Sequence, residues 1–317
     1  MKPHQLAAIA IALALPLGAA HAETRITYKS AKTSSSYYQM GVQIAEAVKA
    51  GTKGAAIVTV EESQGSVQNV MEAAARHGNY VFTSPPALVA SALAGSGPFK
   101  EKANPKFAEI RALFPIPSLT MHFVVRADSG IKDFAGLAGR KMLIGKGSFG
   151  ADEGKKYLEM FGVKDKVELA DVELSNAVAA LKNGQIDGFV IAGSFPAPNV
   201  MEAAAGTGVS LLSLTDDQVA QTKRARIVIP ANTYTGQATD VVTTSLPVVA
   251  YTTTAMDDDT AYLMTRTFWE QKDGMSATAA WWKGVDFGLL ANIGTRLHPG
   301  AIRYYTERGV TLAEAHE

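Results

Sequence analysis

Residues 25–51, RITYKSAKTSSSYYQMGVQIAEAVKAG, decide the fold class of this chain. The first four alternate polar and apolar side chains, which is the pattern of a β-strand, and Ser34–Ser36 can cap a helix. Apolar residues then recur at helical spacing from Tyr37 to Val48, and Gly51 ends the pattern. A strand followed directly by a helix is the repeating unit of an α/β protein.

The same unit recurs twice downstream. A β-branched strand at 56–60 precedes a helical pattern at 67–74, and a strand at 80–82 precedes another at 88–93. Three successive units predict a mainly parallel sheet with crossover helices. A second α/β series follows from residue 121, and the chain ends in a mainly helical tail. We therefore expect two α/β lobes with a cleft between them, the first formed by residues 23–120 plus 250–317 and the second by residues 121–249.

The N-terminus has the order of a secretory signal peptide. Lys2 precedes an apolar run at 6–17, and Ala20 and Ala22 form an A-x-A cleavage site. We expect cleavage after Ala22, removal of residues 1–22 and a periplasmic location. The sequence has no cysteine, so it offers neither a disulfide nor a cysteine for a lipid anchor. Its 30 basic and 30 acidic residues give no net charge, which does not favour nucleic acid as a partner.

The loops after the first three strands predict an anion site. Ligands of open α/β sheets bind beyond the carboxyl ends of the strands, and here each end leads into a helix start. A helix N-terminus presents free N–H groups and partial positive charge. Capping explains any one of these serines alone, but three such loops at one edge favour a carboxylate ligand. The ligand-binding candidates are Ser35, Ser36, Tyr37, Gly65, Ser66, Thr83 and Ser84.

A glycine-rich turn at 145–150, GKGSFG, follows the strand predicted at 141–144. It fits G-x-G-x-x-G, with Glu168 and Asp171 about twenty positions on, so the alternative is a periplasmic nicotinamide-dependent oxidoreductase. The position of the motif deep in the chain and the predicted export speak against that alternative, because such a turn serves any anion. We expect no cofactor, and we take Gly147, Ser148, Phe149 and Gly150 as ligand-facing residues of the second lobe.

Two loop aromatics complete the candidates for the site. Phe195 lies in a proline-rich loop past a predicted strand end, and Tyr234 lies in a polar loop from which its ring can close over a ligand. The six histidines show no H-x-x-x-H spacing, and there is no G-x-S-x-G elbow. We therefore expect no catalytic residue, no metal site and no enzyme activity.

Several short motifs, in order along most of the mature chain, resemble the TAXI class of solute receptors of tripartite ATP-independent (TRAP) transporters. The first loop carries serines where that family has glycines, and Gly78–Pro86 lacks the family's acidic run, so the usual ligand is not assumed. The matching pieces are Ser34–Gly41, Gly65–Asn69, Gly145–Gly150, Leu181–Gly188, Tyr234–Gly236, Asp240–Thr243 and His298–Tyr305.

The resemblance implies a type II periplasmic-binding-protein fold, in which hinge strands join two lobes that close on a small solute. It further implies a monomer that captures glutamate, a related amino acid, a dicarboxylate or a 2-oxo acid for TRAP membrane subunits driven by an ion gradient. The residues leave two other partners open, an ABC importer and a sensor kinase.

Overall fold

The structure is a computed structural model, which describes residues 23–146 and 148–316. The predicted signal peptide, residues 1–22, and the predicted site residue Gly147 lie outside the described residues. The strands are β1 Thr24–Lys29, β2 Ala56–Glu61, β3 Tyr80–Ser84, β4 Ile110–Arg126, β5 Lys141–Leu143, β6 Glu168–Leu169, β7 Gly188–Gly193, β8 Val209–Leu211, β9 Ala225–Ile229 and β10 Val241–Thr253. The α-helices are α1 Ser36–Gly51, α2 Ser66–Ala73, α3 Pro86–Leu93, α4 Phe149–Met160, α5 Ala177–Lys182, α6 Pro198–Gly206, α7 Asp216–Thr222, α8 Asp258–Thr278 and α9 Pro299–Glu307.

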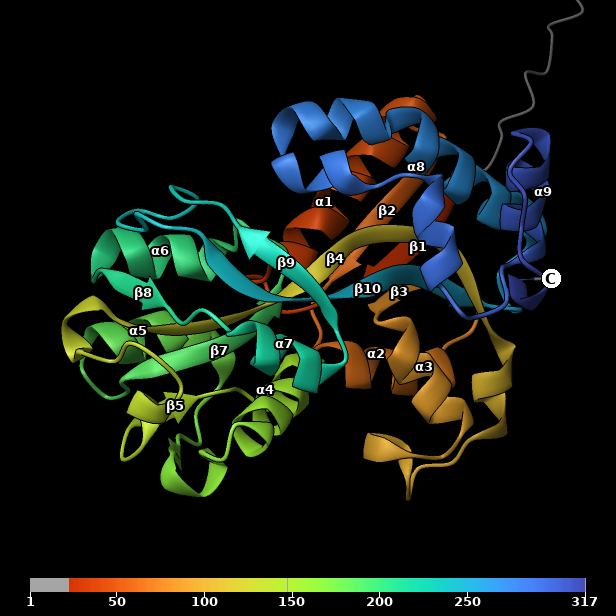
Figure 1. Ribbon diagram of the computed structural model, residues 1–317. Helices are drawn as coiled ribbons and strands as arrows, with labels where there is room; N and C mark the ends of the chain where they lie inside the picture. Colours follow the sequence, from red (N-terminus) through yellow and green to blue (C-terminus); the bar gives the residue numbers. More distant parts are fainter. Residues whose placement is uncertain (1–22, 147, 317) are drawn as a thin grey trace, which may run out of the picture.

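One continuous sheet passes through two groups of helices (Figure 1). Its strand order is β2-β1-β3-β10-β4-β7-β5-β6, with β8 paired to β4 and β9 paired to β10. We call β1–β3 with α1–α3, α8 and α9 the first lobe, and β5–β9 with α4–α7 the second lobe. In the first lobe β1 runs parallel to β2 and β3, as the three strand–helix units predict. In the second lobe β5 runs parallel to both β6 and β7.

The long strands β4 and β10 run antiparallel to each other and join the two lobes (Figure 1). In the first lobe β10 pairs with β3, and in the second lobe β4 pairs with β7. Their mutual register shifts between Leu246 and Val248, where Pro247 interrupts the ladder because it has no N–H to donate. The lobe boundaries predicted at residues 120 and 250 lie within these two strands.

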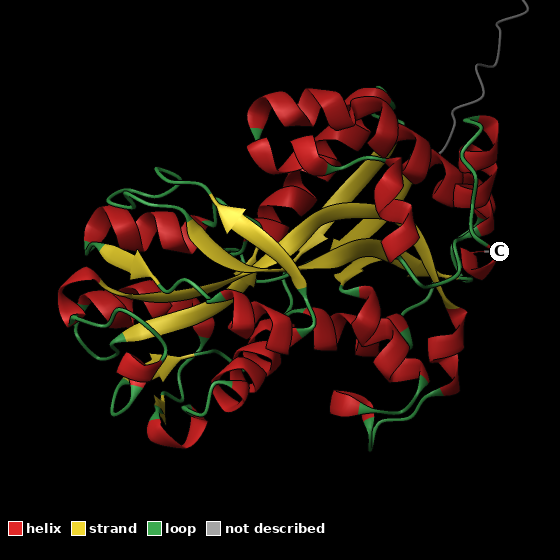
Figure 2. Cartoon of the chain, in the orientation of Figure 1, coloured by secondary structure: helices red, strands yellow, loops and turns green. Residues whose placement is uncertain are grey.

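Helices cover both faces of the sheet (Figure 2). The first helix illustrates why these residues fold in this way. Ser35 caps α1 by accepting a hydrogen bond from the Tyr37 N–H at 3.2 Å, and the buried face carries Met40, Ile44 and Val48. The C-terminal helix α8 packs beside α1, and Phe268 of α8 stacks on Phe114 of β4 with ring centroids 3.9 Å apart. The helical tail is therefore part of the core of the first lobe.

The sequence patterns did not predict α6, α7, β9, β10 or the first half of β4. The series predicted from residue 121 covers only the end of the 17-residue strand β4, because Pro115 and Pro117 interrupt the pattern before it. Proline is rare inside central strands, since it cannot donate a ladder hydrogen bond. In this protein the prolines lie near the place where the strands leave one lobe and enter the other.

Candidate functional site

A cavity lies between the two lobes, next to the strands β4 and β10 that join them. It encloses about 90 Å³, measured for the centre of a water-sized sphere. Its walls come from the loops after β1, β2 and β3 in the first lobe and from β7 and the starts of α4 and α6 in the second. The main polar lining residues are Lys32, Ser34, Ser35, Ser36, Gln64, Ser66, Thr83, Ser148 and Asn199, and the main apolar ones are Tyr37, Leu119, Phe149, Leu174, Val190 and Val248.

The first lobe presents the N-termini of two helices to the cavity. Ser35, the N-cap of α1, and Gly65, the N-cap of α2, both line it. Gly65 makes no side-chain cap, so the first N–H groups of α2 have no partner within the helix or from a capping side chain. Its φ of +118° and ψ of −164° suit glycine alone. This wall therefore carries N–H donors and partial positive charge.

The second lobe presents two more helix N-termini. Ser148 caps α4 by accepting from the Ala151 N–H at 3.1 Å, and Ala197 precedes α6. Gly150 lets α4 lie directly on β7, because a Cβ there would come within 2.9 Å of the Ala192 Cβ. Asn199, in the first turn of α6, lines the cavity and is 6% exposed, yet its Oδ1 has no hydrogen-bond partner.

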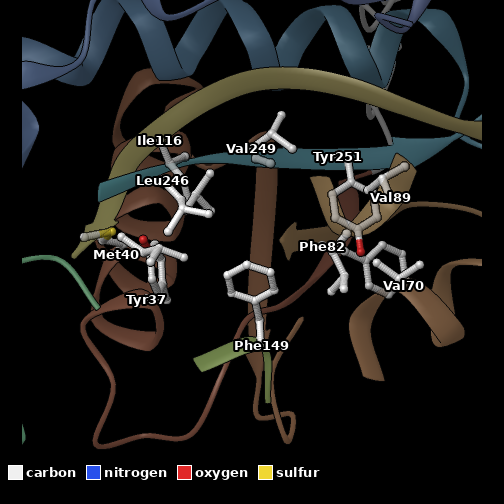
Figure 3. Close-up of a cluster of buried hydrophobic side chains, with 14 of the residues drawn as sticks. Tyr37, Met40, Val70, Phe82, Val89, Ile116, Phe149, Leu246, Val249 and Tyr251 are labelled. Carbon is white, nitrogen blue, oxygen red and sulfur yellow. The ribbon is translucent and has the colours of Figure 1, made fainter. Parts of the chain in front are cut away.

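The two lobes touch each other around the cavity, so the structure is in a closed form. The Ser194 N–H donates to the Ser36 Oγ at 3.1 Å, and a Cβ on Gly65 would lie 3.3 Å from the Ser148 Cβ. Figure 3 shows the ring of Phe149, from the start of α4, pointing toward Val249 of β10 with Tyr37 to one side. Phe149 is 7% exposed and belongs to the large buried cluster, which holds residues of both lobes. An apolar side chain of the second lobe thus forms part of the cavity wall.

The cavity is electrostatically positive. Among the described residues that line it, Lys32 carries the only formal charge. No carboxylate of the described residues lies within 4.0 Å of the Lys32 ammonium group, since none forms a salt bridge with it. Four helix N-termini add partial positive charge to that of Lys32. Such a site suits an anion that is small enough for the space.

The cavity brings together most of the predicted ligand residues. Those that line it are Ser35, Ser36, Tyr37, Gly65, Ser66, Thr83, Ser148, Phe149 and Gly150. The oxygens of Ser35 and Ser148 serve as caps, but a hydroxyl that accepts an N–H bond can still donate its own proton to an anion. Contact of these residues with a ligand stays a prediction.

Three predicted residues do not line this cavity. Ser84 is fully buried behind the cavity, where its Oγ lies 2.7 Å from the Thr83 carbonyl, 3.1 Å from the Tyr251 hydroxyl and 3.2 Å from the Ser66 carbonyl. Phe195 lines a separate hollow of about 560 Å³, together with Trp281. Tyr234 does not close over the cavity, because its ring turns into the core of the second lobe and is 3% exposed.

Tyr234 instead anchors the start of α6 to the sheet. The Ala197 N–H donates to the Tyr234 hydroxyl at 2.9 Å, and that hydroxyl lies 2.9 Å from Nε2 of His122 in β4. The His122 Nδ1 lies 3.0 Å from the Thr120 carbonyl, which can only accept, so Nδ1 carries the proton and Nε2 accepts from Tyr234. Burial lowers the pKa of His122 to about 4 and raises that of Tyr234. Both groups are therefore neutral at pH 7.

The sequence patterns did not single out Lys32 or Asn199. Both follow strand ends, as the rule for open sheets requires. The prediction named the serines beside Lys32 instead of Lys32. In the segment after β7 it named Phe195 instead of Asn199. None of the described arginines lines the cavity, and Arg76, Arg126 and Arg226 pair with Glu72, Asp128 and Asp216.

The glycine-rich turn at 145–150 has a structural explanation that needs no nucleotide. Gly145 has a φ of +74°, and Gly150 allows the close contact between α4 and β7. Lys146 pairs with Asp171, one of the acidic residues that the fingerprint requires for a ribose. Ligand pockets for drug-sized molecules measure roughly 300–1,000 Å³, so a dinucleotide does not fit the closed cavity.

No cluster of three or more histidine, aspartate or glutamate side chains among the described residues has a geometry that suits a metal ion. In the same part of the chain, none of the helices combines the length and the apolar character needed to cross a membrane.

Comparison with known proteins places this fold among periplasmic binding proteins. The model of the NMT1-like family matches residues 29–309. The structure is similar to that of the periplasmic binding protein BugD, with a TM-score of 0.55 and 11% identity over 92% of this chain and 99% of that one. A protein of Bordetella bronchiseptica RB50 matches with a TM-score of 0.51 and 17% identity over 92% of this chain and 83% of that one. The predicted two-lobed α/β fold is thereby confirmed.

A TRAP periplasmic solute-binding protein of Actinobacillus succinogenes 130z, with bound L-galactonate, is also similar. Its TM-score is 0.44, with 16% identity over 91% of this chain and 87% of that one.

Proposed function

The chain belongs to the NMT1-like family, and on that premise we propose that it is a periplasmic solute receptor that captures a small carboxylate for a membrane transporter. The observation that carries the proposal is the charge of the closed cavity. Lys32 and four helix N-termini surround it, and no acidic side chain among its described residues lines it. A buried anion needs such donors, because it leaves its water shell on binding.

The finer parts of the proposal rest on sequence patterns. The A-x-A site at Ala20–Ala22 supports export to the periplasm. The ordered TAXI-like motifs support a TRAP transporter as the partner rather than an ABC importer or a sensor kinase. Transport by vesicles that hold the TRAP membrane subunits tests this assignment. Uptake that requires the receptor and a sodium gradient supports it, and uptake that requires ATP hydrolysis contradicts it.

We further propose that β4 and β10 are the hinge, with lobes at residues 23–120 plus 250–317 and at residues 121–249. The break in their ladder at Pro247 gives the strands a place to bend. In an open form the Ser36–Ser194 contact and the burial of Phe149 would be lost. A ligand stabilises the closed form only as far as it binds that form more tightly.

Replacing Lys32 by methionine will weaken carboxylate binding about 10- to 100-fold, since a hydrogen bond to a charged group contributes about 1.5–3 kcal/mol. Methionine keeps the length and the apolar stem of lysine. Isothermal titration calorimetry of the purified protein with a panel of small carboxylates measures the change. Lys49→Met, at an exposed position in the last turn of α1, is the matched control and should bind like the wild type. Equal affinities for Lys32→Met and wild type would contradict this site.

Replacing Gly65 by alanine will destabilise the fold by about 1–3 kcal/mol, because the new residue must hold a glycine-only conformation. It will also weaken ligand binding severalfold, since the methyl group meets Ser148 only when the lobes are closed. Gly54→Ala is the control, with a φ of +82° and nothing within 4 Å of the added Cβ. We expect that variant to lose stability and keep its affinity. Parallel changes in affinity for both variants would contradict closure across Gly65.

A further inference from the structure

The described residues that line the cavity offer no anionic partner for a positively charged ligand group. Amino-acid ligands carry an ammonium group, which needs anionic or several carbonyl acceptors when it leaves water. The described lining residues include no aspartate and no glutamate, and the four helix N-termini point their positive ends inward. An ammonium group here would be repelled by Lys32, and no carboxylate of the described lining residues would offset its loss of hydration.

The cavity also lacks a second cation. A dicarboxylate bound at Lys32 would bring its other carboxylate against neutral side chains of the second lobe. There the unused polar group is the Asn199 carboxamide, which is 6% exposed and whose Oδ1 has no partner among the described residues. The nearby Ala197 N–H is already bound to Tyr234, and the Ser194 N–H to Ser36. Among the described residues of the second lobe that line the cavity, Asn199 is therefore the one with a buried polar atom that lacks a hydrogen bond.

We propose that the ligand is a monocarboxylate without an amino group, whose far end carries an uncharged group that both donates and accepts hydrogen bonds, a hydroxyl or a carboxamide. This inference rests on the proposed receptor function and narrows its ligand class. The carboxylate meets Lys32 and the uncapped start of α2. The neutral group meets Asn199, whose carboxamide needs one donor and one acceptor opposite it. The short chain between the two ends packs on Phe149 and Leu174.

The volume of the cavity fits this class. About 90 Å³ is open to the centre of a water-sized sphere, so the cavity holds more than a single water and takes a small organic acid. Asn199 is thereby a specificity-determining residue. An acid that lacks the second polar group would leave the buried Asn199 carboxamide without a hydrogen bond. The free-energy cost of that unpaired group makes the site reject such acids.

Three matched probes test the charge rule by isothermal titration calorimetry. Glutaramate has one carboxylate and one carboxamide, glutarate has two carboxylates, and L-glutamine is glutaramate with an added α-ammonium group. We expect glutaramate to bind at least tenfold more tightly than either of the others. Tighter binding of glutarate or L-glutamine that Lys32→Met abolishes would overturn this inference and leave the receptor function standing. If none of the three binds, and no other carboxylate does, both proposals fail.

Variants at Asn199 test its role in specificity. Asn199→Leu keeps the size of the side chain and should weaken glutaramate binding about tenfold while leaving pentanoate, which lacks the second polar group, unchanged or tighter. Asn183→Leu, at an exposed position just after α5, is the control and should change neither. An equal loss of both ligands in Asn199→Leu would show a general packing effect and overturn the assignment of Asn199.

Discussion

Replacing Arg224 by alanine will lower the free energy of unfolding by about 3 kcal/mol, because it leaves a buried carboxylate without its main partner. Glu153 of α4 is 1% exposed, and Arg224 donates to both of its oxygens at 3.1–3.2 Å. Removing one partner of a buried pair costs about 3–5 kcal/mol, and we expect the lower end since Lys156 still contacts Glu153. Thermal unfolding followed by circular dichroism measures the loss.

The chain supplies a matched control two residues further along. Arg226 contacts Asp216 at the surface, where the two side chains are 48% and 87% exposed. Exposed pairs contribute about 0–1 kcal/mol, so Arg226→Ala should unfold close to the wild-type temperature. The double variant Glu153→Leu/Arg224→Met should be more stable than Arg224→Ala, because it removes the buried charge together with its partner. A double variant that is as unstable as Arg224→Ala would mean that arginine packing, not charge, explains the effect.

This pair matters for the site because it fixes α4, whose N-terminus faces the cavity. The second lobe holds both of its cavity helices with buried polar groups, Glu153 on α4 and Tyr234 at the start of α6. In the first lobe Ser35 caps α1 locally, whereas α2 is held by buried Asn69, which donates to the Ser30 and Thr83 carbonyls. Local caps are visible in a sequence, whereas partners that lie far apart along the chain are not.

The same distinction explains what could be predicted. The strand–helix units of the first lobe follow from short-range periodicity and capping, so their strands, their helices and the loops at the cavity were predicted from the sequence. The strand β10 was missed because Pro247 breaks its pattern, and only pairing with β3 and β4 makes it a central strand. No local signal indicates such pairing.

The site shows the same limit. Serines at helix starts led to the correct loops, but Lys32 and Asn199 stand out only once both lobes enclose one cavity. Tyr234 was assigned to the ligand because its loop is polar. Its hydroxyl turns inward because His122, 112 positions earlier in the chain, offers an acceptor in the core. A polar loop constrains where the backbone runs, and it does not determine where an aromatic ring packs.

Below pH 6.5 the protein will lose stability through His122, by roughly 3 kcal/mol in total once pH reaches 4. Burial lowers the pKa of His122 from 6.5 to about 4, so between these values the unfolded chain binds a proton that the folded chain does not. Unfolding is therefore favoured as pH falls through this window, with a slope of about 1.4 kcal/mol per pH unit. Below pH 4 both states are protonated at this residue, and its contribution becomes constant.

Urea unfolding of wild type and His122→Gln at several pH values between 4 and 7 isolates this contribution. Glutamine can still accept from Tyr234 but does not titrate, so the difference in stability between the two proteins should shift by roughly 3 kcal/mol across the window in favour of the variant as pH falls. Burial also lowers the pKa of His298 and His316, and both proteins share that part of the pH dependence. His77→Gln, which changes an exposed histidine, should follow the wild-type curve.

Protonation of His122 also bears on the cavity. With a proton on Nε2, the Tyr234 hydroxyl must accept from both His122 and Ala197, and its own proton loses its partner. The anchor of α6 then weakens, and Asn199 moves with the start of that helix. Ligand affinity of the wild type should therefore fall more steeply than that of His122→Gln as pH drops from about 5 through 4, where the folded protein takes up the proton. Parallel affinity curves for the two proteins would contradict this link. They would show that His122 affects the stability of the fold and not the binding of the ligand.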